Sequence, residues 1–156
     1  MRVSWNAVCL TVLCLIAAAA QAADGQAVFE KNCLMCHQSG GAGLPGQFPR
    51  LAGRIAAISA KPKGRLYLIE LLTYGMTGTV HVDGQDIMGL MPPFAHVSDD
   101  EVAAVLNYLQ GLGDPPKTAP VSFTAAEVHA ARAGPAKSAA EVHAGRKALG
   151  LGKQTP

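Results

Sequence analysis

The sequence Cys33-Leu34-Met35-Cys36-His37 places two thiols and an imidazole within five consecutive positions. On a helical turn, residues three apart lie on one face, so both thiols can reach the same ligand. This spacing is typical of three kinds of site: one half of a zinc site, a redox-active dithiol, and an attachment site for haem c. Other features of the sequence decide between these three kinds of site.

The N-terminal segment predicts export. Met1 and Arg2 form a short basic start, an apolar run covers residues 8–20, and Ala20-Gln21-Ala22 is a small-x-small cleavage site. These features are typical of a secretory signal peptide, and the apolar run of about 13 residues is shorter than the roughly 20 that span a bilayer. We therefore expect residues 1–22 to be a signal peptide, and the mature chain to be periplasmic without a transmembrane anchor.

Loss of this segment removes Cys9 and Cys14 and leaves Cys33 and Cys36 as the cysteines of the mature chain. A zinc site needs a second ligand pair at suitable spacing, but the other histidines are scattered at His81, His96, His129 and His143. A thioredoxin-like dithiol needs a βαβ context, which the sequence does not show. The motif therefore predicts covalent haem c, with Cys33 and Cys36 forming the thioether bonds and His37 binding the iron.

Composition is consistent with one modest domain built around a cofactor. The chain has 156 residues, a formal net charge of +2 and no basic run, which gives no argument for nucleic-acid binding. Only 5% of the residues are aromatic, which is little for a core of this size. A large apolar cofactor would supply the missing core volume.

The chain predicts an all-α fold with a small hairpin insertion. We expect helices over residues 24–36 and 65–74, a Gly-rich loop over 38–53, and a last strong helix that begins at the Ser98–Glu101 capping box. Asp83-Gly84 is flanked by two short segments, 79–82 and 85–88, and predicts a hairpin.

The C-terminal segment contains a repeat. Residues 124–132 recur as residues 138–146, with seven of nine positions identical and a capping box at each start. We expect two short helices on a tail that either docks a partner or frays. The predicted organisation is a signal peptide (1–22), a haem domain (23–113) and an Ala-rich helical tail (114–156).

A sixth iron ligand decides between an electron carrier and an open site. Methionine sulfur raises the reduction potential and suits a carrier. The candidates are Met35, Met76, Met88 and Met91. We favour Met91, because Pro92 and Pro93 stiffen the segment that follows it, and we keep Met88 as the reserve.

Several other residues are candidates for the surroundings of the haem. The second ring nitrogen of His37 needs a hydrogen-bond partner, for which the carbonyl of Pro49 is the first choice and that of Pro45 the second. Leu51, Leu68, Leu72 and Phe94 are candidates for the haem wall. Arg50 and Arg54 are either partners of the haem propionates or solvated surface charges.

With these residues in place, the stretch from Asp24 to Leu112 resembles the class I cytochrome c family. Cys33, Cys36 and His37 match its attachment motif, and Met91 before Pro92 matches its axial methionine. Pro49 and Leu51 match its Pro-x-Leu, in which the proline carbonyl accepts a hydrogen bond from the ligand histidine. The resemblance extends to the contact between first and last helices, at Gly25, Phe29 and Tyr108. It implies helices around one haem and one-electron transfer through an exposed haem edge.

The predicted function is a periplasmic one-electron carrier with His37 and Met91 as axial ligands and no enzymatic bond chemistry. Its expected partners are redox proteins: a dehydrogenase, a terminal oxidase or another cytochrome. The alternatives are a haem enzyme or gas sensor with an open sixth position, and a thiol–disulfide oxidoreductase without haem.

Overall fold

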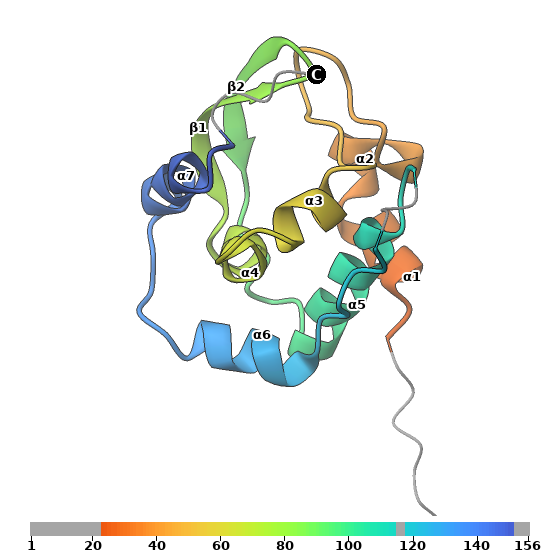
Figure 1. Cartoon of the computed structure of the whole chain (residues 1–156), viewed down its shortest axis with the longest axis vertical. Coiled ribbons are helices and arrows are strands. Elements are labelled where there is room, and N and C mark those ends of the chain that lie inside the picture. The colour runs from red at the N-terminus through yellow and green to blue at the C-terminus, as the bar shows by residue number, and fades with distance from the viewer. Residues whose placement is uncertain (1–22, 115–117, 152–156) are drawn as a thin grey trace, which may run out of the picture.

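The computed structural model describes residues 23–114 and 118–151, and these residues are mainly helical (Figure 1). The predicted signal peptide lies outside the described residues. In Figure 1, α3 and α4 lie centrally, α1 and α5 lie on one side, and the hairpin lies with α7 on the other. The elements are α1 (Gly25–Asn32), α2 (Leu34–His37), η1 (Ser39–Gly41), α3 (Ile55–Ser59), α4 (Gly64–Tyr74), β1 (Met76–Val82), β2 (Gln85–Met91), α5 (Asp99–Gln110), α6 (Ala125–Arg132) and α7 (Ala139–Ala148).

Helices α1 and α5 pack closely at Gly25. The carboxylate of Asp24 caps α1 by accepting a backbone N–H at 2.9 Å. A Cβ at Gly25 would lie 2.2 Å from the carbonyl oxygen of Ala104 on α5, so the contact requires glycine. One turn further, the rings of Phe29 and Tyr108 pack with centroids 5.6 Å apart. The contact that the resemblance implied is present.

A single helix was predicted over residues 24–36, but the structure has two helices there, separated at Cys33. This residue has φ −122° and ψ −28°, and it serves both as the C-cap of α1 and as the N-cap of α2. The N–H of His37 still bonds to the carbonyl of Cys33 at 2.9 Å. The two thiols and the imidazole therefore lie at a junction between two helices.

Helices α4 and α5 agree closely with the predicted ranges, whereas α3 was not predicted. Gly75 ends α4, and the capping box of Ser98 and Glu101 begins α5. The short helix α3 follows a Gly-rich loop and carries only two buried apolar residues, Ile55 and Ile58, so its periodicity is weak. The core between these helices contains Phe29, Leu68, Ile69, Val102 and Leu106.

The predicted hairpin is present and longer than expected. Asp83 and Gly84 have φ values of 51° and 76°, as a tight two-residue turn between twisted strands requires. Pairing continues past the predicted segments to Met76 opposite Met91, because both strands stay extended beyond the apolar alternation. Met76, two residues beyond the helix predicted over 65–74, is the first residue of β1.

The C-terminal segment is packed against the rest of the chain. The repeat places Val128 and Val142 at equivalent positions, and their exposures are 0% and 1%. Helix α6 contacts α4 and α5, and α7 contacts α4 and β1. The expected tail of two short helices is thus present, and its apolar residues complete the core. No helix within 23–114 or 118–151 has the length and apolar character to cross a membrane.

The two copies of the repeat differ in how their glutamates are used. Ser138 and Glu141 form a complete capping box. Thr124 accepts the backbone N–H of Glu127, but the carboxylate of Glu127 turns to an arginine on α4. The first copy therefore has only one of the two hydrogen bonds of its predicted capping box, and the Glu127 carboxylate makes a tertiary contact instead.

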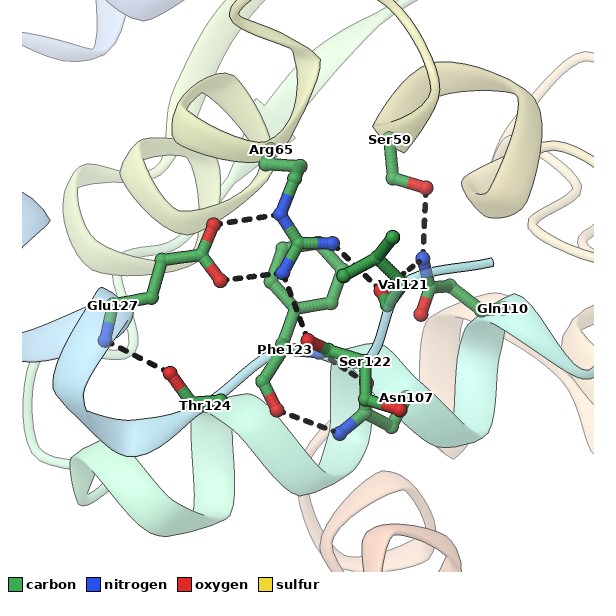
Figure 2. Close-up of polar contacts among 9 residues, drawn as sticks. All are labelled: Ser59, Arg65, Asn107, Gln110, Val121, Ser122, Phe123, Thr124 and Glu127. Carbon is green, nitrogen blue, oxygen red and sulfur yellow. Dashed lines mark hydrogen bonds and ion pairs between the residues drawn. The ribbon is translucent and has the colours of Figure 1, made fainter. Parts of the chain in front are cut away.

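Arg65 of α4 is the centre of this contact (Figure 2). Its guanidinium pairs with both carboxylate oxygens of Glu127, with a distance of 2.7 Å for the Nε bond. It also donates to the carbonyls of Val121 and Ser122 at 2.7 and 3.1 Å, and it lies 3.9 Å from the ring centroid of Phe123. One side chain thus fixes the beginning of the C-terminal segment to the helical core.

We expect Arg65→Met to lower the free energy of unfolding by about 1–3 kcal/mol, since charge-assisted bonds are lost while the pair is only partly shielded from water. Equilibrium urea unfolding of the haem-loaded protein measures this change. The control Lys147→Met removes an exposed cation from α7 and should change stability by less than about 0.5 kcal/mol. Equal stability of the two variants would contradict the role of Arg65.

Candidate haem-binding site

A cavity of about 790 Å³ lies between the hairpin, α2, α3 and α4, and it is also bordered by the loop before α3. Ligand pockets in proteins typically have volumes of about 300–1,000 Å³. Leu68 and Phe94 border the cavity as expected, whereas Leu72 packs in the neighbouring core. The cavity is also bordered by all six residues that the family resemblance assigned to the haem site: Cys33, Cys36, His37, Pro49, Leu51 and Met91.

His37 is buried and held by the carbonyl predicted for it. Its Nδ1 lies 2.9 Å from the carbonyl oxygen of Pro49. A carbonyl only accepts, so Nδ1 carries the proton and Nε2 keeps a lone pair. Burial lowers the pKa of His37, and the hydrogen bond to Pro49 opposes this only in part. The side chain is therefore a neutral imidazole with one nitrogen available to a metal.

The Gly-rich loop brings Pro49 to His37 by folding tightly on itself. The N–H of Gly43 bonds to the carbonyl of His37 at 2.8 Å. Gly43 has φ +71°, and a Cβ there would lie 2.6 Å from the backbone nitrogen of Arg50. Leu51 is fixed by a 2.8 Å bond from its N–H to the carbonyl of Gly41. The loop therefore needs its glycines in order to place a proline carbonyl beside the imidazole.

The two thiols lie at the cavity, and the surroundings of Cys33 do not activate it for disulfide exchange. Cys33 and Cys36 are both partly buried free thiols. Burial, and then the neighbouring Cys36, raise the pKa of the Cys33 thiol to about 11. Reactive dithiols have lowered pKa values because the thiolate is the nucleophile. The surroundings of Cys33 instead raise its pKa and so disfavour the thiolate.

Strand alternation separates the two methionines considered as iron ligands. Successive side chains of a strand point to opposite faces, so Met88 and Met91 of β2 lie on different faces of the hairpin. Ile87, which shares the face of Met91, is buried, whereas Met88 is 82% exposed. Met88 also borders the cavity, but its exposed side chain suits it poorly to bind a metal there.

Met91 is positioned by the residues around the end of β2. A Cβ at Gly75 would lie 2.4 Å from the carbonyl oxygen of Met91. The end of α4 therefore lies so close to β2 that only glycine fits at this position. The N–H of Phe94 bonds to the carbonyl of Leu72 at 2.7 Å and fixes the chain after the two prolines. Met76 pairs with Met91 across the hairpin and also borders the cavity, but its sulfur lies 3.6 Å from the Tyr67 hydroxyl.

The comparison with known proteins agrees with this arrangement. A family model described as cytochrome c matches residues 22–113. Cytochrome c-552 of Thermus thermophilus is 45% identical over 131 residues, which cover 83% of this chain and 98% of that protein. A second cytochrome c-552, from a particular strain of the same species, is also 45% identical over 131 residues, covering 83% of this chain and 87% of the relative.

The chain belongs to the cytochrome c family. The chain is accordingly a class I c-type cytochrome, an electron carrier whose cofactor is covalent haem c. The cavity of this cytochrome fits that group, since it combines largely apolar walls with two thiols and a neutral imidazole.

The cations at the cavity of this cytochrome are the two candidates from the sequence, Arg50 and Arg54, and one further arginine, Arg146. Arg50 makes two bonds to Asp83, of 2.8 and 2.9 Å, and is therefore already paired. Arg54 is more buried, and its Nη2 has no hydrogen-bond partner among the described residues. The sequence analysis missed Arg146, which reaches the cavity from α7. The signal that could have found it is the repeat, in which Arg146 occupies the position of Arg132.

Proposed function

We propose that this cytochrome is an exported one-electron carrier with a single haem, attached to Cys33 and Cys36 and bound axially by His37 and Met91. The observation that carries the proposal is that all four residues border one cavity. They come from two separate parts of the chain, the α1–α2 junction and the end of β2. The cavity that they border, of about 790 Å³, is large enough for a cofactor.

The haem supplies reversible one-electron chemistry, and the protein residues set the conditions for it. The Pro49 carbonyl fixes the imidazole tautomer, so the ligand nitrogen needs no proton transfer when the electron moves. The close contact between Gly75 and the backbone of Met91, with two prolines following, fixes the main chain that carries the thioether and so lowers the entropy cost of ligation. A soft sulfur ligand favours the reduced state and raises the reduction potential.

The partners are proposed to be redox proteins that dock at the cavity mouth: a dehydrogenase, an oxidase or another cytochrome. Exposed apolar side chains border the cavity at Met35, Met88 and Leu90, with exposures of 87%, 82% and 69%. Exposed apolar patches of this kind mark protein contact sites. The predicted signal peptide supports a periplasmic location for these contacts.

Binding of carbon monoxide tests the carrier against a haem protein with an open sixth position. The reduced, exported wild-type protein should not bind carbon monoxide at neutral pH, because Met91 occupies the site, and its visible spectrum should be that of a low-spin c-type haem. Rapid, stoichiometric binding by the native protein would mean that the sixth position is open, and the carrier proposal would then fail.

A further inference from the structure

The hairpin that carries Met91 is attached to the rest of the protein mainly through α7. Its buried side chains Val80, Val82 and Ile87 form a small cluster that is separate from the main core. Among the described residues, α7 is the helix that packs most extensively on the hairpin, through β1 (Figure 1). A two-stranded hairpin alone is marginally stable in water. The position of this hairpin therefore depends on its contact with α7.

His143 of α7 makes the polar part of this contact. Its Nε2 lies 2.7 Å from the carbonyl oxygen of Thr79 on β1. A carbonyl only accepts, so the ring nitrogen donates. In an antiparallel pair, every second residue directs its backbone N–H and C=O away from the partner strand. Counted from the two-residue turn at Asp83-Gly84, Thr79 is such a residue, so His143 binds the outer edge of the hairpin.

The ring of His143 also lies against the backbone of the preceding residue, Gly78. A Cβ at Gly78 would lie 3.1 Å from three atoms of the ring, and the φ of this glycine is +133°. The ring thus occupies the space into which a side chain would project. Gly78 itself borders the cavity. The hydrogen bond and the ring contact together hold two successive residues of β1.

The strand pairing connects this contact to Met91. Gly78 pairs with Gly89, and two residues further along Met76 pairs with Met91. The pairs form one continuous antiparallel ladder. A shift of β1 at Gly78 would therefore displace the end of β2, where the Met91 side chain begins.

The internal repeat supplies a comparison within the same chain. His129 of α6 occupies the position of His143 in the first copy. Its side chain is 80% exposed, and its Nδ1 lies 3.2 Å from the carboxylate of Asp99. Helix α6 packs on α4 and α5. Of the two equivalent histidines, His143 is the one that contacts the hairpin.

We propose that His143 is a positioning residue for the sixth iron ligand: it holds β1 in place and thereby keeps the Met91 sulfur on the iron. The inference rests on the proposed function, in which Met91 binds the haem iron. His143 lies outside residues 22–113, which the family model matches. Without it, the hairpin moves away more often and the sixth position is open for a larger fraction of the time. An added ligand then binds more tightly, in proportion to that fraction.

Imidazole binding by the ferric, haem-loaded protein measures this fraction. His143→Leu should bind imidazole about three- to tenfold more tightly than the wild type, the factor that loss of one hydrogen bond gives. The weak red band of methionine-ligated ferric haem should also disappear at a lower temperature. His143→Gln keeps an N–H donor at this position and should restore most of the wild-type behaviour. The matched control His129→Leu should bind imidazole like the wild type. Equal imidazole affinities of His143→Leu and His129→Leu would overturn the proposal.

Amide hydrogen exchange separates local positioning from a general loss of stability. In His143→Leu, the amides of β1 and β2 should exchange faster, while those of α5 keep their wild-type rates. If all of these amides accelerate equally, His143 is only a stabilising residue and the proposal is overturned. If His143→Leu does not fold, His143→Phe keeps a ring on Gly78 without the donor and carries the same expectations. Absence of the red band in the wild type would instead overturn the proposed function.

Discussion

Replacing Met91 by alanine should remove the sulfur ligand and open the sixth position of the iron. The reduced variant should bind carbon monoxide, and the weak red band that sulfur ligation gives to ferric haem should disappear. Loss of the soft ligand should lower the reduction potential by an amount on the order of 0.1–0.3 V, within the wide range that axial ligands span. Visible spectroscopy and spectroelectrochemistry of the exported protein measure these changes.

Two further methionines provide matched controls for this variant. Met88 is 82% exposed, and Met76 lies beside the Tyr67 hydroxyl. Met88→Ala and Met76→Ala should therefore keep the red band and exclude carbon monoxide. If Met91→Ala keeps the band and one of the other two variants loses it, the axial assignment is wrong.

Replacing Gly25 by alanine should lower the free energy of unfolding by about 2–3 kcal/mol. The new methyl group would meet the carbonyl oxygen of Ala104, which lies 2.2 Å from the ideal Cβ position. Because this neighbour is backbone within a helix, α1 and α5 must separate. The separation also loosens the packing of Phe29 on Tyr108. Guanidinium unfolding of the haem-loaded protein, followed by circular dichroism, measures the loss.

The same substitution at Gly145 serves as the control. A Cβ there would find its nearest neighbour in the Tyr67 ring at 3.8 Å, an ordinary contact. Alanine also favours the helix more than glycine does, so Gly145→Ala should be neutral or stabilising by up to about 1 kcal/mol. The close-packing argument fails if Gly25→Ala and Gly145→Ala are equally stable.

The parts of the fold that could be predicted are those with strong local signals. The Ser98 capping box, the Asp83-Gly84 turn and the apolar face of residues 65–74 each determine their element through neighbours in sequence. The break at Cys33 has no such signal. Helix α3 was also missed, since its two buried isoleucines are too few to establish a helical period.

The site divides in the same way. Cys33 to His37 forms a local motif, and the proline carbonyl follows from the need to orient the imidazole. In the sequence, the stiffness of Pro92 and Pro93 favoured Met91 but left Met88 as a second candidate ligand. In the structure, the strand register places the two side chains on opposite faces. Arg146 lies more than a hundred residues after the motif, and tertiary packing alone brings it to the cavity. In the sequence, the repeat was therefore the only indication of its role.

The most direct measurement of the central claim is the proton NMR spectrum of the reduced wild-type protein with labelled methionine methyl groups. A methyl group held over the haem face by sulfur ligation experiences the full ring current of the macrocycle and shifts far upfield. We expect one such methyl, assigned through its contacts to Met91. A shifted methyl that belongs to Met76 or Met88, or the absence of any, would contradict the ligation of the haem by His37 and Met91.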